Sequence, residues 1–470
     1  MSEVAYQEKV LEVEPFGIEP IPKEERHGRP GQMFTLWFAI SLNVVTWFTG
    51  FLGVEFGLSL GYAILAIVIG NVTGAAFLAL ASAIGPELGQ PLIPASRKTF
   101  GKNGVVGLSF LNFVNNIGWL AVNLVLSVMA LQKILPLSYH YALFLIMAIT
   151  LLIAVFGYNF IHSLAHWMSI VMGVLFVIMT VITVKNLPVI LGSSAQHAGS
   201  FSLGMFILAI AIAFSYQISY CPIGSDYSRY LPQNIPKKKV WLSSYLGSLT
   251  VCIWLEILGA LTASLGMQAG PMEFFSKLMG PFTVPAIITV ILSIFPVNAT
   301  AIYSGGLALL AMGVPMKRWV SALLTGVLGA LLVSFGHGEL ANTYKNFLLL
   351  LSYWIAPWLA VVLCDFFSRT RLPGAEKSSI SGWAGIVSFI CGVAISIPFM
   401  SSALYVGPLA KNYLGGADIS YFLSMLVSAA VYRVLLRFEA ETGPAVSSVS
   451  SCCAVGGIGD NGAGLNEHKA

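Results

Sequence analysis

Amide and indole side chains recur on one face of the segment 109–123. Asn112, Asn116, Trp119 and Asn123 are spaced i, i+4, i+7 and i+11, which is a single face of a helix, and Asn115 lies beside it. An indole offers a stacking surface, and each amide offers a donor and an acceptor. The set therefore suits a planar heteroaromatic ligand such as a nucleobase. For any single Asn, hydrogen bonding between helices is the alternative.

Two further segments combine polar side chains with residues that interrupt helices. The segment 41–50 carries Asn43 and Thr46 and ends in Gly50, and the segment 214–224 contains Pro222, which cannot donate a backbone hydrogen bond. We expect a helix break in each, because unwound backbone is tolerated at membrane depth only where it lines a cavity. Close packing of small residues is the alternative for Thr46. The polar candidates in the second segment are Gln217, Ser219 and Tyr220. A third segment, 283–312, places Asn298 beside Pro296.

Few ionisable side chains lie in apolar surroundings, and such residues mark functional sites in membranes. Glu256 has no charged neighbour in its segment and is the best candidate for a group that carries a proton. Asp226 lies three residues before Arg229, a spacing that also allows a structural ion pair.

The composition identifies the elements that must position these residues. Hydrophobic residues make up 57% of the 470 and charged residues only 9%, with a mean hydropathy of +0.83. Soluble domains carry about 25% charged residues, so the numbers exclude a soluble enzyme, a disordered protein and a nucleic-acid binder. A membrane-crossing helix needs about 20 apolar residues. The sequence predicts an all-α polytopic membrane protein with 12 transmembrane helices, at 32–54, 58–83, 105–132, 140–158, 162–184, 201–224, 240–266, 283–312, 319–335, 343–367, 381–402 and 417–437.

Charge distribution sets the orientation. With the N-terminus in the cytoplasm, 19 of the Lys and Arg residues lie inside and 5 outside, as the positive-inside rule requires. We therefore expect a multi-pass protein of the cell membrane, plasma or inner, with both termini cytoplasmic. No secretory signal is visible, and Cys452 and Cys453 are expected to be reduced, with palmitoylation as the alternative.

The two expected breaks fall in the first and sixth predicted helices, which a five-plus-five inverted repeat would pair. This predicts a cytoplasmic tail over 1–29, a first five-helix repeat over 30–184, an inverted second repeat over 199–367, helices 11 and 12 over 381–437 and a disordered cytoplasmic tail over 438–470.

Four motifs resemble those of the nucleobase:cation symporter-1 family, and within it the purine–cytosine permease branch. They are the segment 17–22 (GIEPIP), the loop 96–104 (SRKTFGKNG), the end of the sixth predicted helix at 225–232 (SDYSRYLP), and Asn298 followed by Tyr303 and Ser304. The similarity spans about residues 15–437.

The resemblance implies a LeuT-type fold, with ten core helices in two inverted repeats plus two more, that binds substrate between helices one, three, six and eight. By position, Trp119 resembles the stacking tryptophan of the family, with Asn116 and Asn112 as amide partners. Gln217 or Tyr220 would cover the other face of the base. Ser219, Asn43 and Asn298 match further polar positions of that site.

The sequence departs from the family in helix eight. Branch members often carry Asn at the positions of Val297 and Ala301. Sodium-coupled relatives use helix-one carbonyls, here those of Ala39 and Leu42, with helix-eight hydroxyls, where this chain has Pro296 and Val297. Na⁺ prefers oxygen ligands, so only Ser293 remains as a substitute. We therefore expect coupling to H⁺, with Na⁺ as the alternative.

The predicted function is import of a nucleobase, cytosine or a purine, by cation symport through alternating access. Alternatives are the same fold with hydantoin, allantoin, uracil or a vitamin precursor as cargo, a membrane-embedded enzyme, or a receptor that does not transport. No catalytic motif favours an enzyme. We expect no cofactor, no metal centre and no nucleic-acid partner, and a monomer is plausible.

Overall fold

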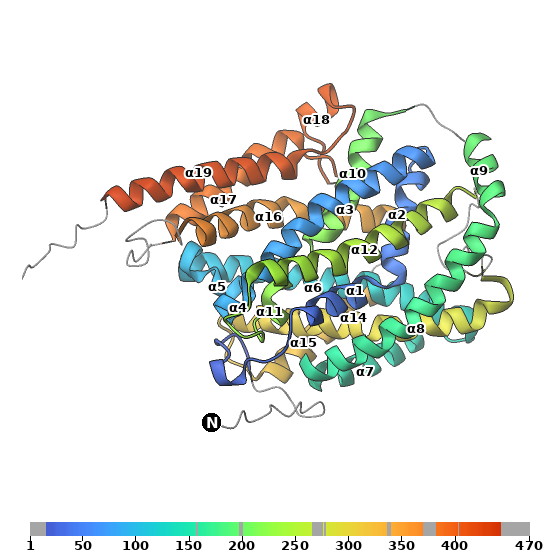
Figure 1. Ribbon diagram of the computed structural model, residues 1–470, viewed down its shortest axis with the longest axis horizontal. Coiled ribbons are helices and arrows are strands. Elements are labelled where there is room, and N and C mark those ends of the chain that lie inside the picture. The colour runs from blue at the N-terminus through green and yellow to red at the C-terminus, as the bar shows by residue number, and fades with distance from the viewer. Residues whose placement is uncertain are drawn as a thin grey trace, which may run out of the picture.

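The computed structural model describes residues 16–156, 158–196, 201–265, 276, 279–335, 340–369, 382–402 and 404–442, which fold almost entirely into helices (Figure 1). The α-helices are α1 Gly31–Ser41, α2 Val44–Glu55, α3 Leu60–Ala83, α4 Gly85–Leu88, α5 Leu92–Ala95, α6 Arg97–Ile134, α7 Tyr139–Phe156, α8 Tyr158–Lys185, α9 Leu187–Gln196, α10 Leu203–Ile218, α11 Gly224–Ser228, α12 Lys237–Ala263, α14 Thr283–Ala311, α15 Arg318–Phe335, α16 Leu340–Arg369, α17 Trp383–Ser396, α18 Pro408–Tyr413 and α19 Ser420–Thr442. Short 3₁₀ turns occupy Lys23–Glu25, Cys221–Ile223, Gly280–Phe282 and Ile397–Phe399.

The long helices are apolar enough to cross a membrane. Within the described ranges, eight helical spans meet the requirements of length and hydropathy, and the bent pair α1–α2 makes a ninth. The apolar helices α7, α15 and α17 are shorter. Each of the predicted spans coincides with one of these helices, so the multi-pass, all-helical architecture is confirmed. Their exact number of crossings stays a prediction.

The first helix is interrupted where the sequence predicted. α1 ends at Ser41, α2 begins at Val44, and their axes differ by 60°. Asn43 holds this break together: its Oδ1 accepts from Val45 N at 2.8 Å and Thr46 N at 3.1 Å, and its Nδ2 donates to Ile40 O at 2.7 Å. The amide therefore caps α2 and satisfies α1 at the same time, which a break inside a membrane requires.

The sixth helix is interrupted as well. α10 ends at Ile218, and the turn Cys221–Ile223 joins it to α11. Pro222 lacks a donor, and the carbonyl of Ser219 accepts from Asn115 Nδ2 of α6 at 3.2 Å. A side chain of another helix thus satisfies backbone that the break leaves free.

Packing divides the helices into groups (Figure 1). α3 packs on α10 and α12, and α12 also packs on α1 and α2. α14 lies along α6 and contacts α7, α8 and α15. α16, α17 and α19 pack together on the opposite side from α7 and α15. The two interrupted helices therefore lie between the α3–α12 pair and the α6–α14 pair.

Glycines allow α2 and α12 to touch backbone to backbone. A Cβ on Gly50 would overlap the carbonyl of Glu256, and a Cβ on Gly259 would overlap the carbonyl of Trp47. Small residues are the usual means of close helix approach in membranes.

This contact predicts a size limit at Gly50. Gly50→Ala should destabilise the protein by about 1–3 kcal/mol, because backbone cannot move aside as a side chain can. Gly107→Ala on α6, where a Cβ meets nothing within 4 Å, is the matched control and should leave stability unchanged or raised. Thermal unfolding of the two detergent-purified variants gives the comparison, and equal midpoints would contradict the packing described.

Candidate functional site

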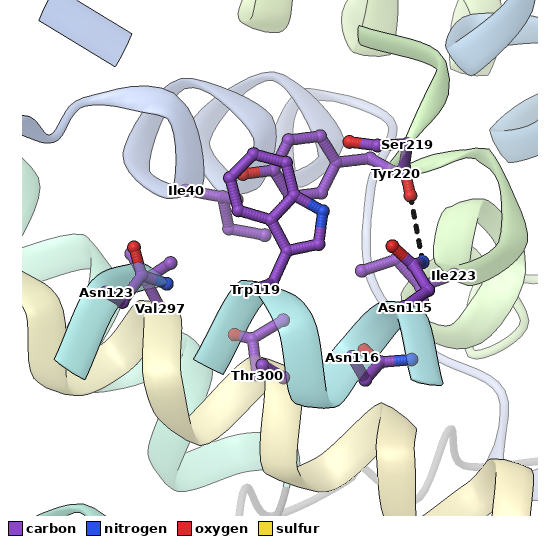
Figure 2. Close-up of a pocket in the computed structure, with 11 residues that line it drawn as sticks. Ile40, Asn115, Asn116, Trp119, Asn123, Ser219, Tyr220, Ile223, Val297 and Thr300 are labelled. Carbon is purple, nitrogen blue, oxygen red and sulfur yellow. Dashed lines mark hydrogen bonds between the residues drawn. The ribbon is translucent and has the colours of Figure 1, made fainter. Parts of the chain in front are cut away.

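A cavity opens where α1, α6, the break after α10 and α14 meet (Figure 2). Its wall is formed by Ile40, Asn115, Asn116, Trp119, Asn123, Ser219, Tyr220, Ile223, Val297, Thr300 and Ala301. These residues come from the first, third, sixth and eighth predicted helices, the four that carry the polar segments of the sequence. The volume is only about 20 Å³, which is room for about one water molecule.

Two aromatic rings fill most of this site. Trp119 and Tyr220 stack with centroids 5.4 Å apart and planes at 20° (Figure 2). Tyr216 meets the indole edge-on at 5.5 Å. A planar ring inserted between the stacked pair needs a separation of about 7 Å, two van der Waals layers. Tyr220 and Trp119 must therefore move apart to admit such a ligand.

Several buried polar atoms around the cavity have no hydrogen-bond partner among the described residues. They include Trp119 Nε1, Asn115 Oδ1 and Asn123 Nδ2, all on residues that line it. Leaving such atoms unpaired costs about 1–3 kcal/mol each. Two donors and one acceptor beside a stacking surface are what the edge of a nucleobase would satisfy.

Asn298 is a third amide with buried atoms that have no partner in the described protein. Both its Oδ1 and its Nδ2 are buried without a partner within the described part of the chain. α6 and α14 run antiparallel, with the Cβ of Asn116 3.3 Å from the ideal Cβ position of Gly305. Asn123 follows Asn116 by seven residues on α6, and Asn298 precedes Gly305 by seven residues on α14, so the two pairs span equal lengths of helix. Asn298 therefore lies at the level of Asn123, one residue from Val297 in the cavity wall.

The structure brings some of the predicted binding residues to the cavity wall. Asn116, Trp119, Ser219 and Tyr220 line it. Ser219 presents its carbonyl to Asn115, and its Oγ donates to Tyr216 O at 2.6 Å.

The other predicted binding residues lie outside the wall. Asn112 lies behind it, where its Oδ1 accepts from Asn116 Nδ2 at 3.2 Å. Thr46 bonds the hydroxyl of Tyr216 at 2.6 Å, and Asn43 is used by the helix break. Gln217 points elsewhere and forms hydrogen bonds with Asn71 and Ser248, while Asn298 lies beside the wall as described.

The cation-coupling candidates are spread over several places. Ala39 and Leu42 flank the first break, where Ala39 O accepts from Leu42 N. Ser293 Oγ donates to Val290 O at 2.7 Å within its own helix. The cavity wall contributed by α1 and α14 near these positions consists of Ile40 and Val297, which are apolar.

The acidic candidates lie away from the cavity. Asp226 Oδ2 accepts from Ser304 Oγ at 2.7 Å, and buried Arg229 donates to Gly17 O at 2.7 Å and to the hydroxyl of Tyr303 at 3.1 Å. This cluster ties α11 to α14 and to the N-terminal segment. Glu256, fully buried on α12, accepts from Asn71 Nδ2 at 2.8 Å.

Three residues of the cavity wall were not singled out from the sequence as binding residues. Asn115 and Asn123 belong to the polar pattern of 109–123, and the second of them shares the face of Trp119, so the signal was present. Thr300 gave no signal, because a Thr inside a helix commonly bonds its own backbone, as its Oγ1 does to Pro296 O at 2.8 Å.

Comparison with known proteins identifies the family. Residues 20–424 match the family described as permease for cytosine/purines, uracil, thiamine, allantoin. A Bacillus subtilis protein with the provisional name of purine–cytosine permease is 30% identical over 91% of this chain and 96% of its own. The purine–cytosine permease of Emericella nidulans is 27% identical over 91% and 89%.

Solved structures agree on the fold. Mhp1, a nucleobase-cation-symport-1 family transporter solved in a closed conformation with bromovinylhydantoin bound, matches with a TM-score of 0.74 at 18% identity over 91% of this chain and 96% of that one. The inward-facing form of Mhp1 matches with a TM-score of 0.71 at 17% identity, over 93% and 96%. The relatives are permeases and transporters, not enzymes. This chain has the LeuT-like fold that Mhp1 has. The chain belongs to the family of permeases for cytosine/purines, uracil, thiamine and allantoin.

Proposed function

We propose that this protein imports a nucleobase, cytosine or a purine, by symport with a proton. The observation that carries the proposal is the stacked pair Trp119 and Tyr220, surrounded by buried amide and indole groups without partners. Stacking supplies affinity to any aromatic ring. The unpaired groups of Asn115, Asn123 and the indole supply selectivity for a base edge, because a ligand lacking matching groups leaves them unpaired.

Helix packing supports an inverted five-plus-five repeat over 30–184 and 199–367. α3 of the first half packs on α10 of the second, and α12 of the second half packs on α2 of the first. α6 and α14, third in each half, pack on each other. When a two-fold axis relates two halves, a contact between a helix of one half and a helix of the other recurs with the halves interchanged. α17 and α19, over 381–437, stand outside this exchange.

Alternating access follows from the two breaks. α1–α2 and α10–α11 would move with α3 and α12 against α6 and α14, and the closed stack of Trp119 and Tyr220 would open as they move. The positive-inside rule, with 19 basic residues on one side and 5 on the other, supports our proposal that both termini are cytoplasmic and that the protein lies in the cell membrane. One chain holds the complete cavity wall, so we propose a functional monomer.

The surroundings of Ser293 favour H⁺ over Na⁺. Ser293 offers one hydroxyl oxygen, and Pro296 and Val297 have no side-chain oxygen. Na⁺ takes oxygen ligands from several groups at once, and this part of α14 offers few.

Replacement of the stacking tryptophan tests the site. Trp119→Ala should weaken base binding roughly five- to 150-fold, since stacking on an aromatic side chain contributes about 1–3 kcal/mol. Trp119→Phe should retain part of the affinity. Trp167→Ala, a control at a 63% exposed position on α8, should bind as the wild type does. Radioligand binding to purified protein gives the values, and wild-type affinity in Trp119→Ala refutes the assignment.

An unpaired amide predicts opposite effects on binding and stability. Asn123→Leu should lower base affinity roughly two- to tenfold, the loss of one hydrogen bond. The same change should leave the unfolding temperature unchanged or higher, because Asn123 Nδ2 loses no partner within the described protein. A variant that is destabilised without loss of affinity would show that Asn123 serves the fold alone.

Uptake into cells identifies cargo and ion together. Radiolabelled cytosine uptake should persist without Na⁺ and collapse with a protonophore. Unlabelled adenine, hypoxanthine, uracil, hydantoin, allantoin and pyridoxine should rank the cargo by competition, with cytosine or a purine the strongest. A strict requirement for Na⁺ contradicts the proton assignment and makes Ser293 the next position to replace. Competition only by hydantoin, allantoin or pyridoxine contradicts the nucleobase assignment.

A further inference from the structure

One buried carboxylate takes no part in the cavity or in an ion pair. Glu256 is fully buried in the middle of α12, its Oε2 accepts from Asn71, and its Oε1 has no partner among the described residues. An ionised carboxylate without a countercharge is unfavourable in a medium of low dielectric constant. A carboxyl group in such a place is suited to bind a proton.

Among the described side chains, the helices around Glu256 place no positive charge beside it. α1, α2, α3 and α8 pack on α12. α1 and α3 contain no Asp, Glu, Lys, Arg or His, and Tyr62 of α3 is 42% exposed. The charged residue of α2 is Glu55, which is exposed, and α8 carries His162, His166 and Lys185, of which the last two are exposed.

Two neutral titratable groups complete these surroundings. The thiol of Cys252 lies one turn away on α12, and the phenol of Tyr344 approaches from α16. Neither supplies a positive charge.

A directed chain of hydrogen bonds leads from Glu256 to the second helix break. Asn71 Nδ2 donates to Glu256 Oε2 at 2.8 Å, and Gln217 Nε2 donates to Asn71 Oδ1 at 2.8 Å. Ser248 Oγ donates to Gln217 Oε1 at 2.7 Å. All three bonds point toward the carboxylate, which in its ionised form can only accept.

The far end of this chain of hydrogen bonds lies at the break that follows α10, which we call the hinge of α10. Gln217 is the last residue but one of α10, two residues before Ser219 and three before Tyr220. Its Cβ lies 2.6 Å from the ideal Cβ position of Gly74 on α3, so Gln217 is held tightly against that helix. Gly50 of α2 touches the backbone of Glu256 at the other end. The chain therefore connects both interrupted helices.

We propose that Glu256 binds the coupling proton and that Asn71 and Gln217 relay its protonation state to the hinge of α10. The proposal rests on the proton symport put forward above. A proton from the outer solution forms an O–H bond on the carboxylate and leaves to the inner solution when that bond breaks. The protonated carboxyl can donate a hydrogen bond. The Asn71 amide then turns so that its Oδ1 accepts from the carboxyl. Gln217 Nε2 thereby loses the acceptor to which it was bonded. The hinge that positions Tyr220 then changes its hydrogen bonding.

Transport by reconstituted protein tests this directly. Full-length protein is placed in liposomes with the membrane potential clamped, and cytosine accumulation is measured against an imposed pH gradient, with a dye reporting internal pH. One proton per base gives about tenfold accumulation per pH unit in the wild type. Glu256→Gln should bring the ratio to about one and abolish proton influx, while cytosine–cytosine exchange continues. Glu55→Gln, the same charge change at an exposed position, should accumulate as the wild type does.

The relay has its own variant. Asn71→Leu leaves the carboxyl in place and should lower the accumulation ratio while exchange continues. Wild-type coupling in Asn71→Leu overturns the relay, and wild-type accumulation with proton influx in Glu256→Gln overturns the proton site. If Glu256→Gln does not fold, Glu256→Asp replaces it, and an unchanged pH profile of uptake overturns the proposal.

The wild-type measurements separate this proposal from the one on which it rests. Wild-type protein that moves no nucleobase refutes the proposed function itself. Wild-type transport driven by a Na⁺ gradient and indifferent to pH overturns the role of Glu256, while nucleobase import stands.

Discussion

Backbone freed inside a membrane must find hydrogen-bond partners within the protein, and this constraint organises the molecule. Asn43 caps α2 and bonds the end of α1 at the first break, and Asn115 bonds the carbonyl of Ser219 at the second. Each break thus has backbone groups that bond to an asparagine side chain of the protein. The cavity exists because these two breaks face α6 and α14 at the same level.

The same constraint explains how amides divide between structure and recognition. The side-chain amides of Asn43, Asn71 and Asn112 have hydrogen-bonded partners in the described protein. Asn123 Nδ2, Asn115 Oδ1 and both ends of Asn298 do not. In a medium without water an unpaired amide is costly. We therefore propose that the groups left in that state beside the stacked indole bind the ligand.

The stacked rings of Trp119 and Tyr220 also close the cavity to a planar ligand. With Trp119 and Tyr220 stacked at 5.4 Å there is no room for a ring between them. A base entering the site replaces one aromatic contact with two. In the proposed transport cycle, the energy for separating the rings comes from the ligand, and binding would drive the movement of the interrupted helices.

Much of this architecture could be predicted from the sequence, because apolar length and proline position are local signals. Both interruptions and the face of Trp119 were predicted. The individual side-chain contacts between distant helices were not, since they depend on tertiary register. Gln217 gave the signal of a binding residue, yet Gly74 brings α3 so close that its amide reaches Asn71. Ser304, which donates to Asp226, lies 78 residues away along the chain, and no local pattern predicts that contact.

The most direct test of the account is a structure of the protein determined with cytosine or adenine bound. The account predicts the base between the rings of Trp119 and Tyr220, now about 7 Å apart, with its edge bonded to Asn115, Asn123 or the indole nitrogen. A base bound elsewhere, or the two rings still stacked on each other with ligand present, would contradict it.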